Sequence, residues 1–118
     1  MEYDEDRELT RYVWAHYQQF LTEYETRVGR AIFGRAKADI AKSKAMAEML
    51  HKKWCRIGDV EIEDALANGP EDFQRLVRNR LLSEHPMEIY VNRCPRCSRV
   101  VRTPRACQCF WCGFDWHE

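Results

Sequence analysis

The chain has 118 residues, of which 45% are hydrophobic and 32% are charged, and its formal net charge is zero. This length and composition are typical of a small soluble globular protein, and zero net charge excludes a strong overall attraction to nucleic acid or to an anionic membrane. No apolar run approaches the roughly 18 residues of a membrane span, and the acidic N-terminus is unlike a secretory signal, so we expect a cytoplasmic protein with reduced cysteines and no membrane partner.

The first part of the chain carries the spacing of an amphipathic helix. Apolar side chains recur at steps of three and four residues, at Leu9, Val13, Tyr17, Phe20, Tyr24 and Val28. This period predicts one long helix with a buried stripe. Gly29 and Gly34 follow the stripe, and we expect the helix to end, bend or restart near them.

Further helices are predicted from their end signals. Ser43 and Asp59 are both placed to cap the helices that follow them. Pro70 suits the first position of another helix, which ends before Pro86. We therefore expect a small helical domain of three to five helices over residues 1–85.

Charge is distributed in blocks within this helical domain. Residues 27–56 hold nine basic and two acidic side chains, and residues 59–72 hold six acidic side chains and no basic one. The simplest interpretation is that the two blocks pair across neighbouring helices.

After Pro86 the pattern changes from helical to β-rich. Residues 87–91 and 98–102 are the two strand candidates, and residues 103–105 form a turn. We therefore expect a second domain over residues 86–118. The predicted fold class is mainly α, with a small helical domain followed by a C-terminal β-rich segment.

The C-terminal segment holds two Cys-x-x-Cys pairs, which are Cys94 with Cys97 and Cys109 with Cys112. Each pair can fold as a tight turn, and together the pairs can present four thiolates to one ion. A tetrahedral set of four sulfurs is what Zn²⁺ prefers in structural sites. Four protein ligands leave the ion no open position, so we expect one structural Zn²⁺ and no active site there.

These motifs resemble the zinc ribbon family, in which two rubredoxin-type knuckles hold one metal ion. The resemblance covers residues 87–118 and rests on Cys94-Pro95-Arg96-Cys97 and Cys109-Phe110-Trp111-Cys112-Gly113. It implies a β-rich zinc ribbon but no particular function, because zinc ribbons bind DNA, RNA or proteins, or only brace a structure. Ser98 departs from the pattern, since it stands where a glycine is usual. We identify no family in residues 1–86.

Two alternatives for this site remain open from the sequence. Cys107 could replace Cys109 as a ligand, although its spacing to Cys112 suits a knuckle poorly. Otherwise Cys107 is a small strand residue or a reactive thiol beside the site. Iron could occupy the same four sulfurs, as in rubredoxin, and support electron transfer.

Arginine is the dominant charged residue of the same segment. Between residues 89 and 114 there are five arginines and no acid, which leaves a charge of about +3 with four thiolates and one Zn²⁺ counted. Arginine suits bidentate phosphate contacts, and aromatic side chains can stack bases. The sequence therefore predicts nucleic-acid contacts at Arg96, Arg99, Arg102, Arg105 and Trp111. The opposing interpretation is that the arginines solvate the segment or pair with acidic helices, while Trp111 packs over the metal site.

We predict from these features a non-catalytic zinc-binding adaptor that contacts nucleic acid or a complex that handles it. One alternative is a protein–protein interaction module, such as a subunit or inhibitor of a larger assembly, with a purely structural metal. Another is a thiol redox switch that uses Cys107. No Ser/His/Asp grouping and no carboxylate pair marks an enzyme, so we expect neither catalysis nor a small-molecule substrate.

Overall fold

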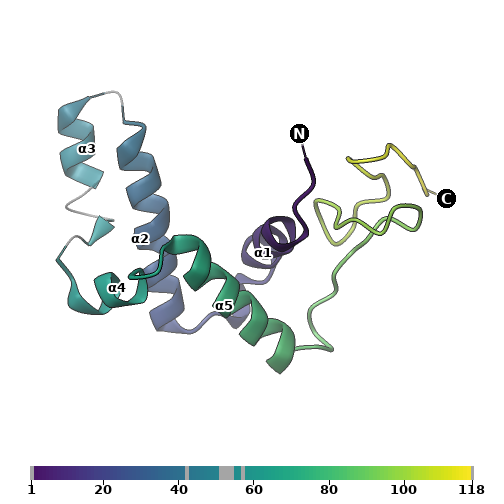
Figure 1. Cartoon of the computed structure of the whole chain (residues 1–118), viewed down its shortest axis with the longest axis horizontal. Coiled ribbons are helices and arrows are strands. Elements are labelled where there is room, and N and C mark those ends of the chain that lie inside the picture. The colour runs from purple at the N-terminus through teal and green to yellow at the C-terminus, as the bar shows by residue number, and fades with distance from the viewer. Residues whose placement is uncertain (1, 42, 51–54, 57, 118) are drawn as a thin grey trace. The chain divides into compact units, whose positions relative to one another are not determined.

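The regular secondary structure of the described chain is helical. The computed structural model describes residues 2–41, 43–50, 55–56 and 58–117, and Figure 1 traces the chain. The elements are, in order, α1 (Glu5–His16), the 3₁₀ turn η1 (Gln18–Phe20), α2 (Glu23–Asp39), α3 (Lys44–Leu50), α4 (Val60–Ala65) and α5 (Pro70–Glu84). None of the described helices combines the length and the apolar character needed to cross a bilayer.

The prediction of a β-rich C-terminal segment is wrong, although the chain is mainly α as predicted. Residues 86–117 contain no strand. Within the described ranges, the backbone pairs in the β manner at two isolated antiparallel bridges, Arg93 with Val100 and Gln108 with Asp115. The segment is therefore a set of loops, without the predicted β-rich ribbon.

Side chains and turns satisfy the backbone of these loops in place of a β ladder. The buried Asn92 side chain donates from Nδ2 to the carbonyl oxygens of Thr103 and Ala106, both at 2.9 Å. Pro104 lies between those two carbonyls and has no N–H to contribute to a ladder. The turn predicted at residues 103–105 is therefore present, and it wraps around one amide side chain, but the predicted strand before it at residues 98–102 does not form.

The predicted long N-terminal helix is interrupted after His16. The N–H of Tyr17 closes α1 by donating to the carbonyl of Val13 at 3.0 Å. A new helix then begins at a capping box, because Thr22 and Glu25 exchange side-chain bonds with each other's backbone N–H groups. The apolar stripe continues across this break, which is why its spacing alone suggested one helix. α2 runs on to Asp39 without the predicted interruption at its glycines.

The other predicted helix ends agree with the structure. Ser43 accepts a hydrogen bond from the N–H of Met46 at 3.1 Å, and Asp59 accepts from the N–H groups of Glu61 and Ile62. α5 begins at Pro70. The helix predicted after Ser43 is described as α3 up to Leu50, and its later positions 51–54 and 57 lie outside the described residues.

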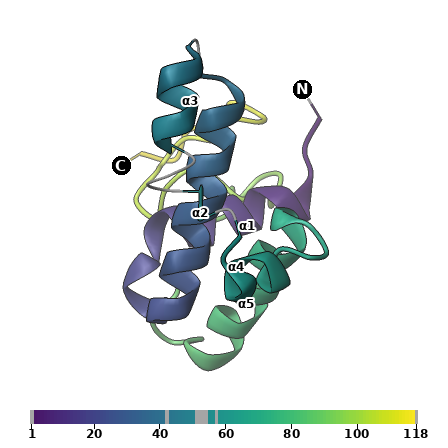
Figure 2. The ribbon, with the colours of Figure 1, turned by 90° about the vertical axis from the view of Figure 1, so that its left-hand side faces the viewer.

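The described chain divides into two compact units, Leu21–Gln74 and the combination of Met1–Phe20 with Arg75–Glu118. Whether residues 1–85 and 86–118 fold as separate domains stays a prediction. In the Leu21–Gln74 unit α2 contacts α3 and α4, and Figure 2 shows α2 and α3 side by side. Its core includes Val28, Ala31 and Ile62, which are fully buried.

The basic and acidic blocks of this unit pair with each other. Arg27 of α2 lies 2.5 Å from the carboxylate of Glu61 in α4, and Arg35 forms a second ion pair with Glu63. The predicted pairing of neighbouring helices is confirmed at these positions.

In the other unit α1 is held by α5 and by the chain that leads into the cysteine loops. The buried Arg78 of α5 donates to the side chains of Asp6, at 2.5 Å, and Thr10, at 3.0 Å. Tyr12 donates to the carbonyl of Tyr90 at 2.6 Å and accepts from the N–H of Asn92 at 3.2 Å. Two hydroxyl bonds to one backbone segment fix the start of the cysteine loops against α1.

Candidate metal centre

The four predicted ligands lie on two loops with the same backbone hydrogen bonds. Adding 15 to each residue number converts one pattern into the other, and we name the loops knuckle 1 (residues 92–101) and knuckle 2 (residues 107–116). In knuckle 1 the bonds run from Cys94 N to Arg99 O, from Ser98 N to Cys94 O and from Val101 N to Asn92 O. In knuckle 2 they run from Cys109 N to Phe114 O, from Gly113 N to Cys109 O and from Trp116 N to Cys107 O. The sequence shows this duplication only at its cysteines, because the other positions differ.

Each knuckle turns through a residue in the left-handed region. Gly113 has φ 80° and its counterpart Ser98 has φ 65°. Glycine adopts this conformation freely, whereas a residue with a Cβ is strained there by about 1–2 kcal/mol. The departure from glycine noted in the sequence is therefore a position of real backbone strain.

Backbone amides point at the first sulfur of each pair. The N–H groups of Arg96 and Cys97 donate to Cys94 Sγ at 3.3 and 3.4 Å. Those of Trp111 and Cys112 donate to Cys109 Sγ at the same two distances. Two N–H donors stabilise negative charge on a sulfur, so each knuckle is prepared to hold a thiolate.

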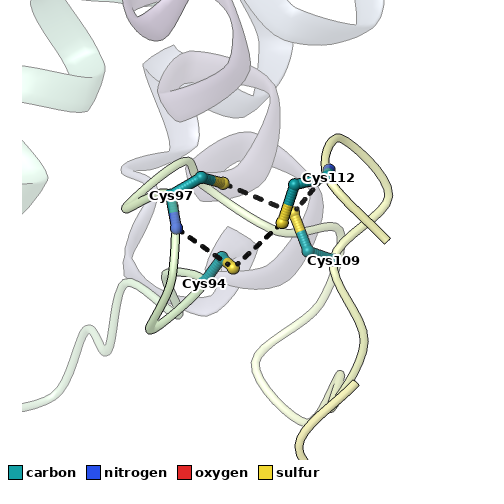
Figure 3. Close-up of side chains that lie close together, drawn as sticks. All are labelled: Cys94, Cys97, Cys109 and Cys112. Carbon is teal, nitrogen blue, oxygen red and sulfur yellow. Dashed lines mark hydrogen bonds between the residues drawn. The ribbon is translucent and has the colours of Figure 1, made fainter. Parts of the chain in front are cut away.

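The four sulfurs face one another across the two knuckles, as Figure 3 shows. Cys94 Sγ lies 3.6 Å from Cys112 Sγ, and Cys97 Sγ lies 3.6 Å from Cys109 Sγ. All four sulfurs lie within 4.8 Å of one another. With a Zn–S bond of about 2.3 Å, a tetrahedron has sulfurs about 3.8 Å apart, so the spacing fits a four-thiolate zinc site. A disulfide would require about 2.05 Å, and all four thiols are free.

The four-sulfur cluster shifts the pKa values of the Cys94 and Cys97 thiols in opposite directions. Burial raises the pKa of Cys94, but the N–H groups of Cys97 and Arg96 outweigh it and bring the pKa down to about 7. The N–H of Arg99 lowers the pKa of Cys97, but burial and the neighbouring thiols outweigh it and raise the pKa to about 11. Cys94 thus ionises readily and Cys97 resists ionisation, because the Cys97 proton is held in hydrogen bonds to the neighbouring sulfurs. A bound cation would displace that proton and favour the thiolate form of all four sulfurs.

A small apolar cluster surrounds the sulfurs. Cys94, Cys109 and Val101 are buried, and the half-buried side chains packed against them are Cys97, Ala106, Trp111, Phe114 and Trp116. Cys112 is the exposed member of the four. Such a shell is too small to fold a segment by burial alone, which is consistent with a cross-link through the sulfurs.

Cys107 stands outside the group of four sulfurs. Its thiol is half-buried and lies 3.5 Å from the carbonyl oxygen of Arg105. It occupies the first position of knuckle 2, equivalent to Asn92 in knuckle 1, and its carbonyl accepts from Trp116. The geometry therefore groups Cys109, and not Cys107, with the other three sulfurs.

No family model, no curated protein and no solved structure matches this chain.

The predicted nucleic-acid contacts lie on and beside the knuckles. Arg96, Arg99, Arg102 and Arg105 are all exposed, and in the described part of the chain none of them forms an ion pair with an acid. The fifth arginine, Arg93, does so, through Glu5. Of the five arginines between residues 89 and 114, only Arg93 forms an ion pair with an acidic helix in the described part of the chain.

The predicted stacking residue Trp111 is partly covered. Its ring meets the edge of the Tyr3 ring at a centroid distance of 5.0 Å, and the Arg99 guanidinium lies 5.3 Å from the Tyr3 ring and 5.9 Å from the Trp111 ring. Tyr3 also accepts from the N–H of Val100 at 2.9 Å. Sequence reasoning missed this role of Tyr3, because the two residues are far apart in the chain and no local pattern links them.

Proposed function

We propose that Cys94, Cys97, Cys109 and Cys112 hold one structural Zn²⁺. Sulfur spacing, paired N–H donors and unbridged thiols support this assignment. When bound, the ion supplies positive charge that keeps four thiols deprotonated and joins the two knuckles. The chain's own part is to present the sulfurs: the amide donors orient Cys94 and Cys109, and Ser98 and Gly113 turn the backbone back on itself.

We further propose that the knuckles form a non-catalytic module that binds nucleic acid. The observation that carries this proposal is the set of four exposed arginines that form no ion pair in the described structure, all within a stretch that lacks acids. A guanidinium group that has no acidic partner can donate two hydrogen bonds to a phosphate, including those of Arg99 and Arg102, which lie over aromatic rings. Their loops are anchored by the cysteines, so the charges would be held in place before binding.

Charge reversal tests the proposal. The triple variant Arg96→Glu, Arg99→Glu, Arg105→Glu should abolish binding of a labelled oligonucleotide while the zinc content measured by elemental analysis stays at one per chain. The matched control makes the same change in net charge on the Leu21–Gln74 unit, with Arg30→Glu, Lys37→Glu, Lys44→Glu. Equal affinity of wild type and knuckle variant would remove the nucleic-acid function.

Salt gives a second test on the unmodified protein. Contact with about four phosphates of a single strand should weaken the affinity about 50-fold between 50 and 200 mM salt. An interface made of apolar side chains should change little over the same range. The slope of log affinity against log salt therefore separates a phosphate-binding surface from a protein-binding one.

A protein–protein interaction module is the second candidate, and one observation favours it. Large apolar side chains are exposed on α2, α3 and the chain between them: Phe33 at 62%, Ile40 at 80%, Met46 at 51% and Met49 at 56%. Purification of the tagged native protein with and without nuclease discriminates the two functions. A nuclease-resistant protein partner that is lost in the variant Phe33→Ser, Ile40→Ser would favour this candidate.

A further inference from the structure

A groove lies between α1 and the two knuckles. Its volume is about 340 Å³, and its lining includes Glu8, Arg11 and Ala15 of α1, Arg102 directly after knuckle 1, and Phe110 and Trp111 of knuckle 2. This volume is at the lower end of the range for small-ligand sites. The groove can therefore accept one planar ring system but no folded partner.

The groove combines aromatic walls with a cationic rim. The Arg102 guanidinium lies 4.0 Å from the centroid of the Phe110 ring. Phe110 remains 49% exposed, so part of its ring faces solvent. Arg11 is exposed, and its pairing with Glu8 is loose at 3.7 Å, which leaves its charge available to an incoming anion.

The second knuckle builds the aromatic wall. Phe110 and Trp111 are the two residues between Cys109 and Cys112, and the N–H of Trp111 donates to Cys109 Sγ at 3.3 Å. The equivalent positions of knuckle 1 hold Pro95 and Arg96. Because the sulfurs fix knuckle 2, the shape of the groove depends on the metal centre.

We propose that this groove holds one unstacked base of a single-stranded nucleic acid, with the adjoining phosphates on Arg11 and Arg102. The inference rests on the proposed nucleic-acid function and narrows it to single strands. In a duplex the bases are paired and stacked, so none can enter a recess of this size, whereas a single strand presents a free ring to an aromatic surface.

The surrounding charge favours a nucleic-acid strand over an acidic peptide. The Arg99 guanidinium lies 5.9 Å from the ring of Trp111 in the groove wall, and the groove-lining acid Glu8 is paired with Arg11 at 3.7 Å. Arg96 and Arg105 are exposed in the same stretch of chain, residues 89–114, which holds no acid. A strand carries one phosphate per nucleotide and can meet several of these guanidinium groups in turn. A peptide could place one aromatic ring in the groove, but its backbone does not carry a negative charge at every residue.

The test compares a labelled twelve-nucleotide single strand with the duplex of the same sequence, using the full zinc-loaded chain at one salt concentration. We expect the single strand to bind at least tenfold more tightly. Ala15→Leu, which fills the groove without adding charge or an aromatic ring, should lower the single-strand affinity about tenfold. Phe110→Ala should lower it by a similar factor.

Ala36→Leu is the matched control, because Ala36 is an exposed alanine of α2 in the other unit. It should leave the single-strand affinity unchanged, and zinc content should be equal in all variants. Equal binding of the single strand and the duplex would overturn the groove inference, and so would an Ala15→Leu variant with wild-type affinity. Neither result would overturn the proposed nucleic-acid function, which is tested separately by the charge reversal of Arg96, Arg99 and Arg105. Absence of binding to either nucleic acid would overturn both. If a peptide of glutamate and tyrosine bound more tightly than the single strand, and Ala15→Leu weakened that binding, the occupant of the groove would be a peptide and the inference would be overturned.

Discussion

Glu5 and Arg93 form a two-point ion pair across 88 positions of the chain. Arg93 Nη1 donates to one carboxylate oxygen of Glu5 at 2.9 Å, and Nη2 donates to the other at 2.7 Å. Nη1 also donates to the carbonyl of Ser98 at 3.0 Å. One guanidinium thereby ties the first turn of α1 to both sides of knuckle 1.

The Glu5–Arg93 ion pair should make part of the free energy of unfolding depend on pH. The bonds from Arg93 hold the pKa of the Glu5 carboxyl below its ordinary value of 4.5. Because the folded pKa lies below the unfolded one, the stabilisation is present above about pH 4.5 and is lost as the pH falls through the folded pKa. Both side chains are partly exposed, so Glu5→Gln should destabilise by at most about 1 kcal/mol at neutral pH.

Denaturant unfolding of wild type and Glu5→Gln at several pH values between about 2 and 7 measures this effect. The difference between the two proteins should shrink toward zero at the acid end, and taking the difference removes any shared effect of acid on the metal centre. Glu2→Gln, in the same exposed segment, is the control and should match wild type throughout. A constant difference across the range would show that the pair does not act through charge.

The left-handed residues of the two knuckles should respond in opposite directions. Ser98→Gly relieves backbone strain and should stabilise the zinc-loaded protein by about 0.5–1 kcal/mol. Gly113→Ala should destabilise it by about 1 kcal/mol and weaken zinc in a chelator competition, since a Cβ there meets no atom within 4 Å and only the backbone is strained. Gly58, in the Leu21–Gln74 unit, has the same left-handed backbone and open space, so Gly58→Ala is the control. It should lower stability without changing zinc affinity.

The hydroxyl group of Tyr12 should contribute more to the stability of the folded protein than the hydroxyl group of Tyr90. Tyr12→Phe leaves the backbone N–H of the buried Asn92 without this partner, which should cost about 1–3 kcal/mol, while the carbonyl of Tyr90 keeps its second bond from the Tyr17 hydroxyl at 3.0 Å. Tyr90→Phe removes a longer bond of 3.4 Å from an exposed side chain to Asn92 and should change stability by less than about 0.5 kcal/mol. Denaturation midpoints of the two variants provide the comparison. Equal midpoints would mean that Tyr12 does not anchor the start of knuckle 1.

Single cysteine substitutions should separate ligands from bystanders. Cys94→Ser should reduce the bound zinc from one per chain to near zero and unfold both knuckles, because the metal contributes on the order of 10–16 kcal/mol to modules of this kind. Cys107→Ser should keep full zinc content and the wild-type melting temperature. Cobalt absorption in the thiolate charge-transfer region checks both. A Cys107→Ser protein that loses metal would reverse the ligand assignment.

The sequence was a good guide wherever a few neighbouring residues decide the structure. The caps at Ser43 and Asp59 and the start of α5 at Pro70 are short-range hydrogen-bond and dihedral effects, and the structure contains them. The spacing of the two cysteine pairs likewise implied that four sulfurs could meet. By contrast, the stripe from Leu9 to Val28 hid the break between α1 and α2, because apolar spacing survives a short interruption of the backbone.

Sequence alone thus specified which residues could cap helices, which sulfurs could share an ion and where positive charge accumulates, since each depends on residue identity and local spacing. The tertiary structure decided how the C-terminal backbone is satisfied: the predicted strands do not form, and the side chain of Asn92 bonds the carbonyls of Thr103 and Ala106 around the predicted turn. It also decided that Glu5 and Tyr3 contact knuckle 1 while four arginines stay unpaired in the described chain. Those outcomes depend on contacts between distant residues, and no periodicity in the sequence encodes which distant side chain reaches a given backbone group.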